Sequence, residues 1–160
     1  MILLLMSLIL VTCGSDSNKS QRTPKTENVR YDVYDITGKG HRLDEWIGKQ
    51  PVVLNFWGTW CGPCRREIPS LVKLYGEFAP KGVEMIGLAV KDKPEKVQMF
   101  SQQYGMTWVM LMANREVLTK FRVISGIPQT IFLDKNGTEV RRYVGAKPYE
   151  ALKQGFEAIL

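Results

Sequence analysis

Two cysteines separated by a Gly-Pro dipeptide, Cys61 and Cys64, are the residues of this sequence best suited to do chemistry. They follow the apolar run Val52–Trp57, typical of a buried strand, and precede a helical pattern. The free N–H groups and dipole at a helix start stabilise a thiolate, lowering a cysteine pKa below its usual value of about 8.5. We therefore expect Cys61 to attack a substrate disulfide and the more buried Cys64 to resolve the mixed disulfide.

Two other interpretations of the pair are a structural disulfide and half of a zinc site. A start-of-helix location favours reactivity over a structural disulfide. Zinc requires two further ligands, and outside the pair the chain offers only Cys13 and His41. His41 follows a turn-like Gly-Lys-Gly segment and is expected to be an exposed structural histidine, so no metal site is predicted.

The hydrophobic pattern around the pair predicts alternating strands and helices, which indicates an α/β fold with a parallel-type sheet covered on both faces. A short hairpin over Val29–Ile36 and a helical turn over Leu43–Ile47 are expected to open the domain. The further strands are expected at Val83–Val90, Trp108–Leu111, Gln129–Asp134 and Thr138–Val144, the last two joined at Asn136-Gly137. Helices are expected from the pair to Pro80, over Pro94–Tyr104, after Asn114 and after Pro148.

The first residues predict export. Residues 1–12 are apolar but shorter than the roughly 20 residues of a membrane span, which is typical of a signal peptide. Leu10–Cys13 resembles a bacterial lipoprotein processing box, with Thr12 at a position usually held by a smaller residue. Cys13 would then carry the lipid; the alternative is a plain secretory signal with Cys13 a leftover thiol. Residues 13–28 are predicted to be a flexible tether, and 29–160 the domain, placed outside the cytoplasm in the periplasm or at the cell surface.

The charge pattern says less about partners. The net charge is +6, but the basic residues are scattered, which argues against nucleic-acid binding. The densest basic spot, Arg65-Arg66, lies beside the pair. These two arginines either lie on a solvated helix face or attract an acidic partner.

The motif Trp-x-x-Trp-Cys-Gly-Pro-Cys and the segment Gly126–Thr130 (GIPQT) resemble thioredoxin, specifically its TlpA/ResA-like branch of secreted, membrane-tethered proteins. The resemblance covers Val29 to the C-terminus. It implies a thioredoxin fold: a central mixed sheet flanked by helices, with an N-terminal hairpin extension. It also implies an inserted strand-helix unit, which we place at Val83–Tyr104.

The resemblance also implies how substrate binds. Ile127 and Pro128 match the family's cis-proline loop, which sits against the cysteines and whose backbone pairs with the substrate like an added strand. The expected substrate contacts are Trp60, Gly62, Pro63, Ile127 and Pro128. Trp57 is expected to be core.

Two polar positions distinguish this chain from thioredoxin itself. Thioredoxin's buried aspartate is replaced by Asn55, which cannot accept a proton. The ResA-like pattern has a glutamate near the active site that matches Glu67, which we expect to take the proton from Cys64 during exchange. The alternative is a surface glutamate that stabilises the first turn of the helix.

The predicted function is thiol-disulfide exchange with extracytoplasmic proteins, with the redox-active Cys61–Cys64 disulfide and no other cofactor. The Gly-Pro dipeptide matches that of thioredoxin, whose reduction potential is near −270 mV, whereas that of the oxidant DsbA is about −120 mV. The dipeptide therefore favours a reductase. Expected partners are disulfide-containing secreted proteins, apocytochrome c being one family substrate, and a membrane thiol reductant. The alternatives are a disulfide oxidase or isomerase, a thiol peroxidase and a non-catalytic binding module. Gly58 argues against the peroxidase, because peroxiredoxins carry Thr at this position, three residues before the reactive cysteine.

Overall fold

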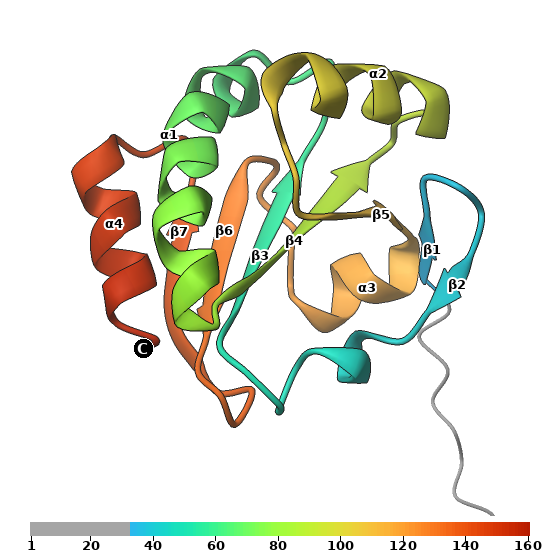
Figure 1. The fold of residues 1–160 in the computed structure, drawn as a ribbon. Coiled ribbons are helices and arrows are strands. Elements are labelled where there is room, and N and C mark those ends of the chain that lie inside the picture. Colours follow the sequence, from blue (N-terminus) through green and yellow to red (C-terminus); the bar gives the residue numbers. More distant parts are fainter. Residues whose placement is uncertain (1–32) are drawn as a thin grey trace, which may run out of the picture.

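A computed structural model describes residues 33–160, which form one seven-stranded sheet in the order β2-β1-β5-β4-β3-β6-β7 (Figure 1). The strands are β1 (Val33–Asp35), β2 (Gly40–His41), β3 (Val52–Trp57), β4 (Glu84–Val90), β5 (Val109–Ala113), β6 (Gln129–Leu133) and β7 (Glu139–Val144). The α-helices are α1 (Gly62–Phe78), α2 (Pro94–Tyr104), α3 (Arg115–Lys120) and α4 (Tyr149–Glu157). Two short 3-10 helices are η1 (Leu43–Glu45) and η2 (Ala79–Lys81).

The sheet is mixed, as the resemblance implied. Strands β3, β4 and β5 run parallel, because α1 and α2 provide the crossovers that parallel neighbours require. Strand β6 is antiparallel to β3, and β7 returns antiparallel to β6 through the turn at Asn136-Gly137. The β1–β2 hairpin joins the other side through antiparallel pairing of β1 with β5.

Alternation along the fully buried β3 divides the core between two faces of the sheet. Val53 and Trp57 pack in one cluster with residues of α1, α2 and α4. Leu54 and Phe56 pack in the other, with residues of η1 and α3. Figure 1 shows α1 and α4 side by side over the sheet, and the Phe78 and Phe156 rings meet between these helices, 5.1 Å apart. The sheet is therefore covered on both faces, as predicted.

Most element boundaries lie within a few residues of those expected. The hairpin differs, because only β1 falls within the predicted range Val29–Ile36 and β2 follows at Gly40–His41. Strand β5 is displaced, beginning at Val109 and ending at Ala113. The strand-helix unit predicted at Val83–Tyr104 is β4 with α2, and β4 lies at the centre of the sheet next to β3. The predicted signal peptide, Cys13, the tether and residues 29–32 of the hairpin lie outside the described residues. Within 33–160, no helix combines the length and the apolar character needed to cross a membrane.

The strand registers bring three loops to one edge of the sheet. Phe56 pairs with Gln129, so Pro128 lies where β3 ends. Trp57 pairs with Ala89 in the parallel neighbour β4, so the loop after Val90 reaches the same edge. The loop from β3 to α1, which carries Cys61, therefore lies between these two.

Candidate active site

The cysteine pair lies at the start of α1 and is oxidised in the structure. The S–S distance is 2.07 Å. Cys61 is the N-cap and Gly62 and Pro63, both exposed, open the helix. The Cys64 backbone N–H donates a hydrogen bond to Cys61 Sγ over 3.2 Å. The Cys61 sulfur thus occupies the position where a helix N-terminus stabilises negative charge. Cys64 was expected to be more buried than Cys61. The difference is small, since Cys61 is 4% exposed and Cys64 is 2% exposed.

The segment predicted to be the cis-proline loop faces the pair. The Ile127–Pro128 peptide bond is cis, and Pro128 is buried. The Ile127 carbonyl oxygen lies 3.8 Å from Cys61 Sγ. The structure therefore brings the cysteine pair together with the predicted substrate-binding segment, although more than 60 residues separate them in the sequence.

Glu67 is buried, with 3% of its surface exposed, so the alternative of a surface glutamate is wrong. Its Oε2 accepts the Lys147 backbone N–H at 2.8 Å, and its Oε1 is approached by Asn55 Nδ2 at 3.4 Å and Thr130 Oγ1 at 3.5 Å. Burial raises the pKa of the Glu67 carboxyl above its usual value, and these hydrogen bonds only partly oppose the effect. Glu67 and Cys64 are three residues apart on the buried side of α1, a spacing that places side chains next to each other.

Besides Asn55, which the sequence singled out, Glu67 contacts two groups to which the sequence gave no role, Thr130 and Lys147. Asn55 and Thr130 pair across β3 and β6, and Asn55 Nδ2 donates to Thr130 Oγ1 at 3.0 Å. Thr130 is the last residue of the Gly126–Thr130 motif that predicted the cis-proline loop, but the sequence did not predict a role for its side chain. Lys147 carried no signal, because its contribution comes from its backbone rather than its side chain.

The two tryptophans that precede the pair occupy different environments, as expected. Trp57 is fully buried, whereas Trp60 is 58% exposed. The Trp60 indole N–H donates to the Val90 carbonyl at 3.0 Å. Next to it, Asp92 accepts hydrogen bonds from the Thr59 N–H and hydroxyl. The loop before Cys61 is thereby fastened to the loop after β4.

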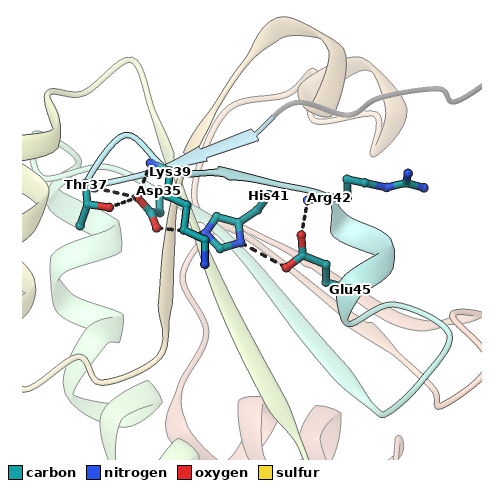
Figure 2. A network of polar contacts seen from close by, with 6 residues as sticks. All are labelled: Asp35, Thr37, Lys39, His41, Arg42 and Glu45. Atoms are coloured by element: carbon teal, nitrogen blue, oxygen red, sulfur yellow. Dashed lines mark hydrogen bonds and ion pairs between the residues drawn. The ribbon is translucent and has the colours of Figure 1, made fainter.

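His41 lies in a separate polar network on the β1–β2 hairpin (Figure 2). Its Nε2 is 3.0 Å from Asp35 Oδ2, and its Nδ1 is 3.2 Å from Glu45 Oε2. The hydrogen bond with Asp35 is the main cause that raises the pKa of His41. These contacts agree with the predicted structural role of His41. The histidine is not exposed as expected, since only 11% of its side chain is accessible. Across 33–160, no three His, Cys, Asp or Glu residues are grouped so that they could hold a metal.

Comparison with known proteins agrees with this geometry. A family model described as the AhpC/TSA family matches residues 21–141. The thiol-disulfide oxidoreductase ResA of Geobacillus thermodenitrificans is 34% identical over 125 residues, 78% of this chain and 71% of that protein. ResA of Bacillus anthracis is 32% identical over 140 residues, 88% of this chain and 80% of that protein.

Solved structures are similar over most of the domain. A thioredoxin-family thiol:disulfide interchange protein from Chlorobium tepidum matches with a TM-score of 0.70 and 27% identity, covering 79% of this chain and 90% of that one. A secreted Mycobacterium tuberculosis disulfide oxidoreductase, homologous to E. coli DsbE, matches with a TM-score of 0.69 and 25% identity, covering 81% and 96%. The chain belongs to the AhpC/TSA family within the thioredoxin superfamily and, on its sequence relatives and its site, to the ResA-type thiol-disulfide oxidoreductases.

Proposed function

We propose that this thiol-disulfide oxidoreductase acts as a reductase of disulfides in proteins outside the cytoplasm. The observation that carries the proposal is the position of Cys61. Its sulfur caps α1, accepts the Cys64 N–H and lies against the Ile127 carbonyl, where an extended substrate would pair. A thiolate at this point is stabilised by the helix and lies beside the backbone that would hold the substrate disulfide.

The reduced enzyme acts in two exchange steps. The Cys61 thiolate attacks one sulfur of the substrate disulfide, forms a mixed disulfide and releases the other substrate sulfur as a thiolate. The Cys64 thiolate then attacks Cys61 Sγ, which forms the observed disulfide and releases the second substrate thiolate. Two electrons pass from the cysteine pair to the substrate, and the pair itself is the redox group, so the proposal includes no other cofactor.

Glu67 accepts the proton that Cys64 must lose before the second step. Its carboxylate is buried on the same side of α1 as Cys64. The raised pKa of Glu67 supports this role, because a general base works best when its pKa approaches the pH at which it acts. Asn55 and Thr130 position the carboxyl oxygen, and the Lys147 N–H remains bonded to the other oxygen.

The reductase direction, the partners and the location rest on further reasoning. The thioredoxin-like Gly-Pro dipeptide supports a low potential. A membrane thiol reductant would regenerate the pair, and disulfide-containing secreted proteins, including apocytochrome c, would be its substrates. The secreted relative from M. tuberculosis supports an extracytoplasmic location. The resemblance of Leu10–Cys13 to a lipoprotein processing box supports Cys13 as the lipid-bearing residue. Arg65 and Arg66 are exposed on α1 and are available to an acidic partner.

Substrate trapping tests the proposal. A Cys64→Ser variant cannot resolve the mixed disulfide, so it should retain its partner on Cys61, whereas a Cys61→Ser/Cys64→Ser control should retain none. We expect non-reducing gels to show mixed disulfides with secreted proteins. Purified enzyme should also reduce protein disulfides with a dithiol as reductant. Faster turnover of hydrogen peroxide than of protein disulfides would contradict the proposal and favour a thiol peroxidase.

A further inference from the structure

Three buried side-chain atoms have no hydrogen-bond partner within residues 33–160, and all three lie in one region of the core. They are Asn55 Oδ1, Trp57 Nε1 and Trp108 Nε1. Each belongs to a residue that is at most 4% exposed. A buried polar group without a partner costs about 1–3 kcal/mol, so three of them close together indicate a small ligand that bonds to all three.

A row of paired residues across the sheet brings these atoms together. Gly87 on β4 pairs with Met110 on β5 and with Asn55 on β3. Asn55 in turn pairs with Thr130 on β6. Residues paired in this way share one face of the sheet, here the face that α1 covers, since Glu67 of α1 contacts Asn55 and Thr130. Gly87 therefore leaves room on this face between two side chains.

The two indoles meet beside Gly87. A Cβ added there would lie 2.9 Å from Trp108 Nε1, 3.0 Å from Trp57 Nε1 and 2.7 Å from Met110 Sδ. The nitrogen is thus the atom of each indole that lies nearest to this place. We name the place the indole site and define it by Gly87, Trp57, Trp108 and Met110.

The indole site fits a bonded water molecule. Both nitrogens lie within 3.0 Å of one point, and N–H···O hydrogen bonds span about 2.7–3.2 Å. A position further from the Gly87 backbone, reached by moving around the line that joins the two nitrogens, keeps both distances. One oxygen can therefore accept both indole N–H groups and clear the Gly87 backbone.

Asn55 supplies an acceptor next to the indole site. Its Nδ2 donates to Thr130 Oγ1 on the β6 side of β3, which leaves the Oδ1 branch of the amide for the β4 side, where Gly87 lies. A water can thus donate one hydrogen to Asn55 Oδ1 and direct the other towards Met110 Sδ, a weak acceptor. Chloride could accept both N–H groups but would repel Asn55 Oδ1, so this set of donors and acceptors favours water.

The Asn55 amide connects the indole site to the active site. Its Nδ2 lies 3.4 Å from Glu67 Oε1. Burial raises the pKa of Glu67, and this contact is one of those that oppose the rise. The titratable groups that face the carboxyl are Lys147, from the loop before α4, and Cys64, from α1, whereas the groups of the indole site are neutral. A water that donates to Asn55 Oδ1 favours the orientation in which Nδ2 faces Glu67.

We propose that the indole site binds one water molecule, and that this water makes Asn55 a positioning residue for Glu67. The water accepts hydrogen bonds from Trp57 and Trp108 and donates one to Asn55 Oδ1, about the number that buried waters make. Asn55 Nδ2 then holds the Glu67 carboxylate where it can accept the Cys64 proton. The effect on exchange rests on the proposed function, because it requires Glu67 as the proton acceptor; the binding of water does not.

Nuclear magnetic resonance of the oxidised protein, labelled with ¹⁵N at the tryptophan indoles, tests the water site. Cross-relaxation between water and the indole N–H groups of Trp57 and Trp108 should have the sign of a long-lived bound water. The Trp60 indole is the internal control, because its N–H bonds to the Val90 carbonyl and should show no such water. Trp57→Phe and Trp108→Phe assign the signals.

Gly87→Ala places a methyl group in the indole site and should abolish the water signal at both indoles. Asn55 then loses the bond that orients it, so the titration midpoint of Glu67, followed by the ¹³C signal of its carboxyl, should shift to higher pH. Trp108→Phe removes one donor and should cause a smaller shift in the same direction; it provides the test if Gly87→Ala does not fold. Gly76→Ala is the matched control, because it adds the same methyl to α1 where nothing lies within 4 Å, and it should change neither measurement.

Two results would overturn the inference. One is the absence of a long-lived water at both indoles of the unmutated protein, and the other is a Glu67 midpoint that neither variant moves. Neither measurement uses catalysis, so failure to reduce protein disulfides would overturn the proposed function and leave the water site standing. In the active enzyme, the pH midpoint of the single-turnover rate at saturating substrate should move upward together with that of Glu67. A rate profile that stays fixed while the Glu67 midpoint moves would overturn the effect on exchange.

Discussion

Glu67→Gln should make the folded protein more stable at neutral and alkaline pH, although it alters a buried and bonded residue. The substitution keeps an oxygen that can accept the Lys147 N–H and removes the charge that burial opposes. The new amide hydrogens have an acceptor as well, since the buried Asn55 Oδ1 has no partner within residues 33–160 and can face them if the Asn55 amide turns. Glu67→Ala, in contrast, would leave the Lys147 N–H unpaired and should cost about 1–3 kcal/mol, plus a cavity.

The sign of the effect follows from proton linkage. The folded-state pKa of Glu67 is raised, so its contribution to stability is complete below the unfolded value of about 4.3 and is lost as pH rises through the folded value. Each tenfold increase in proton affinity on folding corresponds to about 1.4 kcal/mol. We therefore expect the stability difference between Glu67→Gln and the unmutated protein to change with pH, in favour of Gln at high pH.

Urea unfolding of the oxidised proteins at about pH 4 and about pH 8 measures this difference. Glu95→Gln, on the exposed surface of α2, is the control and should show little difference at either pH. If Glu67→Gln is destabilised equally at both pH values, the ionised Glu67 carboxylate is as stable in the folded protein as it is in the unfolded, solvated chain. The argument that burial prepares Glu67 to take a proton would then be refuted.

Three further changes test other parts of the structure. The raised pKa of His41 means that its contribution to stability is complete below about pH 6.5 and is lost as the pH rises through the folded-state pKa. The unmutated protein should therefore lose stability above about pH 6.5, whereas His41→Gln should not show this loss. Unfolding at several pH values measures the difference. Gly155→Ala should destabilise by about 1–3 kcal/mol, because a Cβ there would lie 2.4 Å from the Phe132 ring. Gly76→Ala, also in a helix but with nothing within 4 Å of the new Cβ, should instead stabilise by about 0.5–1 kcal/mol, and melting temperatures compare the two.

The sequence predicted the elements that local patterns define. Continuous apolar residues marked β3, and helical periodicity marked α1. The cis-proline loop was predicted through resemblance to a family rather than through any local pattern, because its position depends on the pairing of β3 with β6. Local patterns cannot specify which distant strands become neighbours.

The burial of Glu67 is the clearest case that the sequence left undecided. A glutamate in the first turns of a helix is usually exposed, and its burial here depends on Asn55, Thr130 and the Lys147 backbone, which come from three other parts of the chain. His41 differed from expectation for a similar reason. Its turn-like surroundings suggested exposure, but Asp35 and Glu45 hold the ring in the hairpin network.

The reduction potential of the Cys61–Cys64 pair, determined by equilibration with thiol-disulfide buffers, tests the central claim most directly. The account predicts a value near that of thioredoxin, about −270 mV, for a pair that passes electrons to substrate disulfides. A value above about −150 mV would contradict the account, because a pair so easily reduced would withdraw electrons from substrate thiols and act as an oxidase.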